Sequence, residues 1–229
     1  DARVGEPYGT IQGTDFVYQD GQRVINSKGY YEKTGTSDKI IGNVNPDWTG
    51  GVSNTFTYSN FALSFLVDMQ QGGDIFSLDQ WYGMATGLYA ETDFTNDLGN
   101  PVRNSISQGG GYILPGVKED GTPNDVRIAG NNYHAFGYTD SPNARLVYDA
   151  SYIKLRSASL TYNVPKTLLN NTFIAGASLS VVGSNLWIIH KNLPHAGPEA
   201  SQGAGNIQGW QSGVMPTTRN IGFSVKVQF

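Results

Sequence analysis

The stretch Ile221–Phe229, with the sequence I-G-F-S-V-K-V-Q-F, determines how the whole chain is interpreted. Apolar residues occupy every second position of it: Ile221, Phe223, Val225, Val227 and Phe229. Successive side chains of a β-strand point to opposite faces, so this stretch predicts a strand with one apolar and one polar face. In a soluble sandwich the apolar face would pack against a second sheet, and in an outer-membrane barrel it would contact lipid. This strand alone leaves both architectures open.

The composition favours an all-β protein. The 229 residues include 29 glycines and 13 tyrosines, and only 15% are charged; such chains with short alternating runs are typical of strands joined by turns. No apolar run approaches the roughly 18 residues that a membrane-spanning helix needs, whereas barrel strands give only a weak hydropathy signal. The net charge of −4, without a cluster of Lys and Arg, argues against nucleic acid as a partner. Because cysteine is absent, a disulfide framework and a thiolate metal site are excluded.

A first pair of strands is expected over residues 48–71. Trp48 opens the first strand, Ser59-Asn60 forms a short turn, and the second strand follows. One face of the second strand carries an unbroken apolar series: Phe61, Leu63, Phe65, Val67 and Met69. The period of two over this length predicts a strand that is apolar on one side only.

A second pair is expected over residues 149–189, and a terminal strand over residues 215–229. The later half of the first strand in this pair has one apolar face: Ala158, Leu160 and Tyr162. Two alternating series compete in its earlier half: Ile153 and Leu155 against Lys154 and Arg156. A β-bulge between the two halves would shift the register.

Long loops alternate with short turns along the chain. Residues 72–148 and 190–214 are rich in Gly and Pro, and residues 1–47 form a further loop in which Asp20-Gly21 predicts a small hairpin. The long segments therefore all fall at one end of the strands, as expected of a membrane barrel whose long loops lie outside the cell. A sandwich gives no reason for this segregation, and a loop as long as residues 72–148 counts against a compact soluble fold.

Several motifs carry a family resemblance. They are G-N-V-N-P-D-W-T-G-G at residues 42–51, L-S-F-L-V-D-M-Q-Q-G-G-D-I-F at 63–76, D-A-S-Y-I-K-L-R-S-A-S-L-T-Y-N-V-P at 149–165, V-G-S-N-L-W at 182–187 and P-T-T-R-N-I-G-F-S-V-K-V-Q-F at 216–229. In this order they resemble the carboxy-terminal barrel region of SusC/RagA-type transporters, which are TonB-dependent outer-membrane proteins of Bacteroidota. The resemblance covers nearly the whole chain.

This resemblance implies an antiparallel transmembrane β-barrel segment, about the last five strands of a barrel of roughly 22 strands that surrounds a plug. It implies import of oligosaccharides or peptides, energised through the TonB complex, with a SusD-like surface lipoprotein as a lid. Five strands cannot close a barrel, so we expect the plug and the remaining strands to come from elsewhere. The terminal Phe229 resembles the signal that the outer-membrane assembly machinery recognises.

Catalytic, cofactor-binding and metal-binding residues are not predicted. The three histidines, His134, His190 and His195, lack the spacing of metal ligands, and no H-E-x-x-H or G-x-S-x-G motif occurs. The expectation is therefore a protein that is not an enzyme and that needs no cofactor.

Three aromatic residues of the long loops are candidate contacts for a ligand or for the lid: Trp81, Tyr82 and Trp210. Aromatic faces suit the apolar faces of pyranose rings, although packing within the loops is an equal alternative. Trp81 and Tyr82 fall in residues 75–89, where Ile75 and Leu78 contribute to a helical pattern.

The predicted lipid-facing residues are the two apolar series: Phe61, Leu63, Phe65, Val67 and Met69, with Ile221, Phe223, Val225 and Val227. The competing hypothesis is a soluble β-sandwich module that binds carbohydrate. The two hypotheses differ in what covers the apolar face, since a sandwich would cover it within the protein itself.

Overall fold

The computed structural model describes residues 3–130, 133–137, 139–199, 201, 203 and 205–229. The chain divides into two compact units. One, called here the sheet unit, comprises Pro46–Gly72, Ala150–Ala200 and Met215–Phe229. The other, the loop unit, comprises Asp1–Asn45, Gly73–Asp149 and Ser201–Val214. Each unit therefore combines three stretches of sequence.

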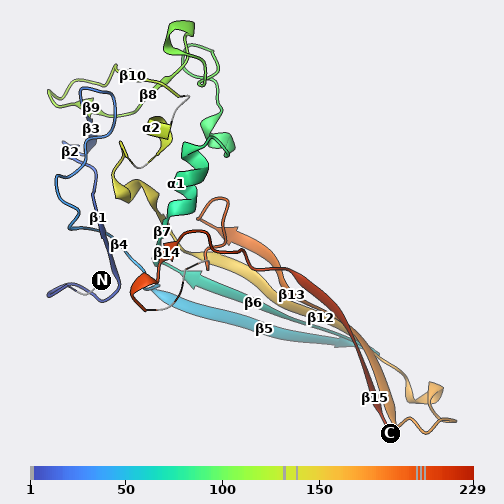
Figure 1. The fold of residues 1–229 in the computed structure, drawn as a ribbon. Helices are drawn as coiled ribbons and strands as arrows, with labels where there is room; N and C mark the ends of the chain where they lie inside the picture. Colours follow the sequence, from blue (N-terminus) through green and yellow to red (C-terminus); the bar gives the residue numbers. More distant parts are fainter. Residues whose placement is uncertain (1–2, 131–132, 138, 200, 202, 204) are drawn as a thin grey trace. The chain divides into compact units, whose positions relative to one another are not determined.

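The sheet unit contains five antiparallel strands (Figure 1). In chain order they are β5 (Trp48–Tyr58), β6 (Phe61–Gln71), β12 (Tyr152–Asn163), β13 (Gly176–Lys191) and β15 (Asn220–Gln228). Their order across the sheet is β15-β13-β12-β6-β5. The five strands predicted from alternation are thus present and hydrogen-bonded to one another. The terminal strand begins at Asn220 rather than at Met215, and β13 begins at Gly176.

Short connections join the strands within each pair at one end of the sheet, called here the turn end. Ser59 and Asn60 connect β5 to β6, and Ser59 has a φ of 53°. A 3-10 helix, η4 (Lys166–Leu168), lies in the connection between β12 and β13. Proline precedes this helix at position 165 and ends the strand pairing, because it has no N–H to donate.

The strand register separates an apolar face from a polar face. Residues that lie opposite each other in an antiparallel pair share a face. Leu63 lies opposite Phe56 and Leu160, and Leu160 lies opposite Val181, which faces Phe223. This row of five apolar side chains crosses all five strands. The adjacent row on the other face contains Thr55, Ser64, Ser159, Val182 and Gly222.

A bulge in β12 keeps both halves of that strand in phase with the sheet. Leu155 lies opposite Val67 and Ser157 lies opposite Leu66, so Arg156 is an extra residue without an opposite partner on β6. Because of this shift, Ile153 and Leu155 share the apolar face with Ala158. The β-bulge considered from the two competing series is therefore confirmed.

The loop unit is built from short strands and helices. Its strands are β1 (Thr10–Gly13), β2 (Tyr18–Gln19), β3 (Gln22–Ile25), β4 (Lys39–Asn43), β7 (Asp74–Ser77), β8 (Tyr112–Ile113), β9 (Val117–Lys118), β10 (Arg127–Ile128), β11 (Val147–Asp149) and β14 (Trp210–Gln211). Its helices are α1 (Leu78–Ala85) and α2 (Tyr133–Phe136), with the 3-10 turns η1 (Ala90–Thr92), η2 (Ile106–Gln108), η3 (Asn143–Leu146) and η5 (Gly205–Ile207). The strands pair as β1-β4, β10-β8, β11-β7-β14 and β2-β3-β9.

The hairpin predicted at Asp20-Gly21 is confirmed. β2 and β3 pair antiparallel across it, with Gln19 opposite Gln22. Asp20 and Gly21 have φ angles of 48° and 76°. Both positions therefore have the positive φ that a two-residue hairpin turn of this kind requires.

The helical pattern of residues 75–89 is only partly borne out. Helix α1 begins after Ser77, whose hydroxyl accepts the N–H of Gln80 at 3.2 Å, and this is the usual role of a helix N-cap. Ile75 does not belong to the helix, because it lies in β7 opposite Tyr148. Pairing with a distant strand overrides the local periodicity at this position.

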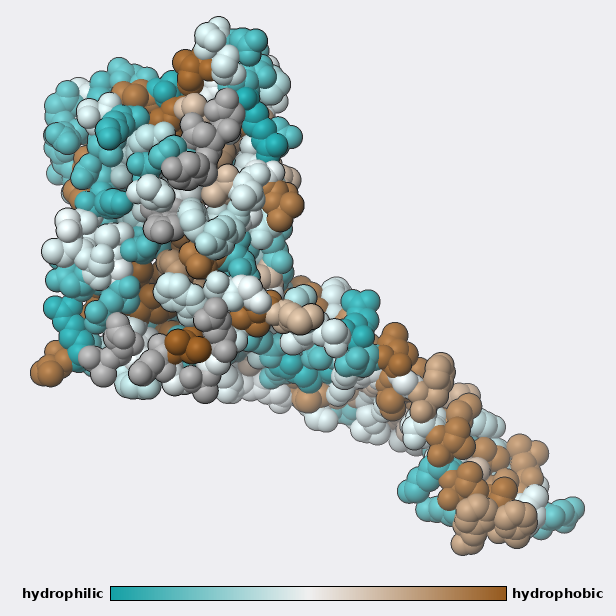
Figure 2. All heavy atoms as spheres, viewed as in Figure 1, coloured by the Kyte–Doolittle hydropathy of each residue, from teal (hydrophilic) through white to brown (hydrophobic). Residues whose placement is uncertain are grey.

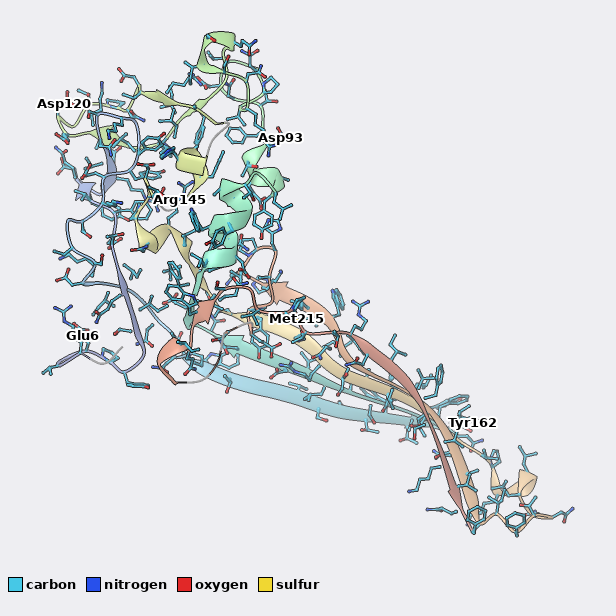
Figure 3. All side chains as sticks on the ribbon, viewed as in Figure 1. Glu6, Asp93, Asp120, Arg145, Tyr162 and Met215 are labelled. Carbon is cyan, nitrogen blue, oxygen red and sulfur yellow. The ribbon has the colours of Figure 1, made fainter. Side chains whose placement is uncertain are left out.

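The loop unit has its own apolar core, so the long loops are not structureless. One cluster consists of Phe16, Ile25, Tyr31, Leu114, Ile128, Ala135 and Phe136, all buried. Arg145, labelled in Figure 3, lies with its guanidinium carbon 5.9 Å from the centre of the Tyr31 ring and donates to Ser141 Oγ at 2.8 Å. The residues of this core come from segments more than a hundred positions apart, which sequence periodicity does not detect.

No helix in the described part of the chain has both the length and the apolar character needed to cross a membrane.

Candidate functional site

The apolar face of the sheet is exposed rather than covered. Phe223 in β15 is 77% exposed and Phe56 in β5 is 57% exposed. Figure 2 shows hydrophobic residues gathered toward the turn end of the strands. At that end Tyr162, labelled in Figure 3, lies with its ring centre 5.0 Å from that of Phe61. The large apolar side chains on this face therefore contact neighbouring side chains of the same sheet, and their outer surfaces face solvent.

Two tryptophans mark the opposite end of the same face. Trp48 is the first residue of β5, and Trp187 lies near the end of β13, opposite Leu155. Both side chains are largely exposed. Tryptophan at the rim of an apolar band is the arrangement found where a protein meets a membrane interface.

The polar face carries hydroxyl pairs between neighbouring strands. Thr55 Oγ1 lies 2.9 Å from Ser64 Oγ, and Thr161 Oγ1 lies 2.8 Å from Ser180 Oγ. These cross-strand hydrogen bonds stabilise the sheet on this side. The face therefore suits water or polar protein surface.

A group of charged side chains lies on the polar face of the sheet and is called here the Arg156 cluster: Asp68, Tyr152, Lys154, Arg156 and Glu199. Arg156 donates to Asp68 Oδ2 through Nε at 3.1 Å and forms ion pairs with both Asp68 and Glu199. Lys154 Nζ lies 2.7 Å from Glu199 Oε2. Tyr152 donates its hydroxyl to Asp68 Oδ2 at 3.1 Å. Two cations and two anions balance one another.

The electrostatics of this cluster favour fully charged groups. The Lys154 side chain is only 3% exposed, and an ammonium that is desolvated to this degree requires a partner. Burial acts to raise the pKa of Glu199, but hydrogen bonds from Arg156 and Lys154 outweigh burial, and the pKa is lowered. Glu199 follows β13 in the chain, so the cluster fastens the segment after β13 to the polar face. Each of the five side chains has a partner within the cluster.

The loop unit contains a pocket of about 200 Å³, called here the Trp210 pocket. Four stretches of sequence line it, and the residues used below are Tyr8, Gln12, Val44, Phe76, Gln208 and Trp210. Backbone hydrogen bonds join the stretches: Val44 N–H donates to Gly9 O at 2.9 Å, and Phe76 N–H donates to Gly209 O at 2.8 Å. The ring centres of Trp210 and Phe76 lie 4.6 Å apart.

The three candidate aromatic contacts do not form one site. Trp210 lines the pocket, as its place in β14 beside β7 allows. Trp81 and Tyr82 lie next to each other on α1, with ring centres 4.3 Å apart, and neither lines the pocket. Sequence reasoning missed Tyr8, Gln12 and Gln208, since no local pattern distinguishes them from other polar loop residues.

In the part of the chain that is described, no group of three His, Asp or Glu side chains is placed to hold a metal ion. His134 contacts the carboxylate of Asp140 through Nδ1. His190 and His195 are exposed.

Comparison with known proteins gives a consistent result. No family model matches the chain. Three TonB-dependent receptors of Formosa agariphila match it: receptor P3 with 25% identity over 99% of this chain, P26 with 26% over 96%, and P39 with 27% over 96%. The chain spans 23%, 22% and 19% of the length of these relatives, about a fifth.

Solved structures agree in fold. The RagAB peptide importer in its closed-closed state matches 96% of this chain with a TM-score of 0.59 and 18% identity, and the open-open state matches with a TM-score of 0.58 and 17% identity. The matched region is 23% and 22% of those chains. The resemblance predicted from the motifs is thus confirmed: the chain is similar in sequence to TonB-dependent receptors and similar in fold to the RagAB peptide importer.

Proposed function

We propose that this chain supplies five membrane-spanning strands to a TonB-dependent importer of the outer membrane in a Bacteroidota-like bacterium. The observation that carries the proposal is the continuous apolar face of the sheet. In this arrangement the lipid-facing residues are Phe61, Leu63, Phe65, Val67, Met69, Ile221, Phe223, Val225 and Val227. The polar face then lies toward the plug.

The dimensions of the strands support this arrangement. β5 and β6 have 11 residues each. At about 3.3 Å per residue and a tilt of about 45°, such strands cross about 25 Å, which matches the apolar band of outer-membrane barrels. Trp48 and Trp187 then lie at one boundary of the band.

The soluble sandwich is not favoured by any observation. A sandwich would need a second sheet over Leu63, Phe223 and their row, and these side chains are exposed in the described structure. A water-facing apolar surface of this extent is itself a sign of an interaction with lipid or protein.

The roles of the loops, of the partner chains and of Phe229 are proposed from the family resemblance. Residues 1–47, 72–148 and 190–214 form extracellular loops, and a SusD-like lipoprotein acts with them as a lid. The remainder of the barrel, the plug and the TonB complex complete the transporter, which takes up oligosaccharides or peptides without catalytic chemistry of its own. Phe229, which directly follows β15, acts as the signal for the outer-membrane assembly machinery.

Extraction of native membranes tests the proposal. The polypeptide is solubilised in detergent, run on a non-denaturing gel, and its co-migrating chains are identified by mass spectrometry. We expect a large, detergent-dependent complex that contains a barrel and a lipoprotein. A polypeptide that stays in the aqueous fraction as a monomer near 24.8 kDa would contradict the proposal.

A further inference from the structure

The Trp210 pocket contains an aromatic ring that packs on one face against a buried side chain. Phe76 is buried, and the Trp210 ring packs against it with the ring planes 36° apart. Trp210 nevertheless remains 41% exposed, and Tyr8 adds a second exposed ring to the same pocket. An aromatic ring fixed on one side and accessible on the other presents a large, rigid surface to a ligand.

The polar groups of the pocket are uncharged. The side-chain amides of Gln12 and Gln208 line it, and neither amide has a hydrogen-bond partner among the described residues. Each amide provides both a donor and an acceptor, which is what a hydroxyl group needs. No described residue that lines the pocket carries a formal charge. An ionised ligand would therefore lose water without gaining a counter-charge.

The pocket is small, and one part of its wall is closely packed. Its volume of about 200 Å³ is below the range of about 300–1,000 Å³ for sites that enclose a drug-sized ligand. Gly209 has a φ of 77°, and a Cβ at this position would lie 2.1 Å from Val44 Cγ1. The backbone at Gly209 therefore lies directly against Val44. A volume of about 200 Å³ has space for a single ring and not for a longer segment of ligand.

We propose that the Trp210 pocket binds one ring of a neutral oligosaccharide. The apolar face of the pyranose packs on Trp210, and its hydroxyls bond to the amides of Gln12 and Gln208. This proposal rests on the importer function and narrows its substrate from oligosaccharides or peptides to neutral oligosaccharides. Uronic acids and peptides with charged groups are disfavoured, because the pocket has no ion to pair with them.

Binding measurements on the complete transporter with its partner chains test the proposal. The probes are maltohexaose, laminarihexaose and xylohexaose, with hexagalacturonate and a zwitterionic hexapeptide as counter-probes, measured by isothermal titration calorimetry in detergent. At least one neutral hexamer should bind, and the Kd should rise at least tenfold in Trp210→Ala. Trp81→Ala is the matched control, because Trp81 lies in the same unit but outside the pocket, and its Kd should stay within twofold of the unmodified protein.

The heat-dependent gel mobility of each variant shows separately whether the transporter has assembled. Gln208→Ala is a second, milder substitution that should also raise the Kd. The proposal is overturned when no neutral hexamer binds, or when Trp210→Ala binds as tightly as the unmodified protein. Uptake of labelled substrate by whole cells distinguishes failure of the pocket assignment from failure of the importer function. Peptide import without saccharide binding overturns the pocket assignment alone, whereas loss of membrane association overturns the importer function itself.

Discussion

A charged residue in the middle of β6 distinguishes the two faces of the sheet. Val67 and Leu66 are adjacent aliphatic residues near the centre of this strand, and they lie opposite Leu155 and Ser157 in β12. Val67→Arg places a guanidinium on the apolar face, and Leu66→Arg places it on the polar face. An arginine on the lipid side near the bilayer midplane costs about 2–4 kcal/mol, which lowers the folding equilibrium constant by a factor of about 30 to 1,000. Leu66→Arg should cost about 1 kcal/mol or less, as for substitutions at polar surfaces.

Urea titration of the complete transporter, refolded into lipid vesicles, measures both costs. The two variants lose aliphatic side chains of similar size, so their difference reports the surroundings of the new charge. We expect the unfolding midpoint of Val67→Arg to lie well below that of Leu66→Arg. Equal midpoints, or a larger loss in Leu66→Arg, would refute the assignment of the apolar face to lipid.

Two further predictions concern the loops. Glu199→Gln should destabilise the transporter by about 1.5–3 kcal/mol, the range for hydrogen bonds to charged groups, because the buried Lys154 loses its ion-pair partner; urea titration at pH 7 measures this. The pKa of Glu199 is lowered in the folded protein, so its stabilising effect is complete above the unfolded pKa of about 4.3 and is lost as the pH falls through the folded pKa. The free energies of unfolding of Glu199→Gln and of the unmodified protein should therefore converge at low pH. A constant difference between the two free energies at all pH values would contradict the ion pair. Gly209→Ala should lower the melting temperature more than Gly213→Ala. Both glycines have positive φ, but only the Cβ at Gly209 would collide with Val44, and equal effects would show that backbone conformation alone is responsible.

The strands were predictable because their pattern is local. The alternation of Phe61, Leu63 and Phe65 places β6 and its apolar face, and Asp20-Gly21 places a hairpin through its positive φ angles. β12 shows where this reasoning stops. Its two competing series do not say where the register shifts. The extra residue, Arg156, is held by contacts with Asp68, Asn185 and Glu199, which lie in other segments of the chain.

The Trp210 pocket was much less predictable. Trp210 was a candidate contact on its chemistry alone, but Tyr8 and Gln12 are about two hundred positions away in the chain. They reach the pocket through backbone hydrogen bonds such as the one from Val44 to Gly9. Contacts of this kind between distant loops leave no periodicity in the sequence, so the pocket emerges only from the fold.

The most direct test of the central claim is a spin-label scan of β6, Phe61–Gln71, in the complete transporter in lipid vesicles. Cysteine is absent from this chain, so each label in it occupies a single defined position. The account predicts that accessibility to dissolved oxygen alternates with a period of two and peaks at positions 61, 63, 65, 67 and 69, where accessibility to a water-soluble nickel complex is low. Oxygen and nickel accessibilities that are both low at these five positions would mean that protein covers the apolar face, and would contradict the account.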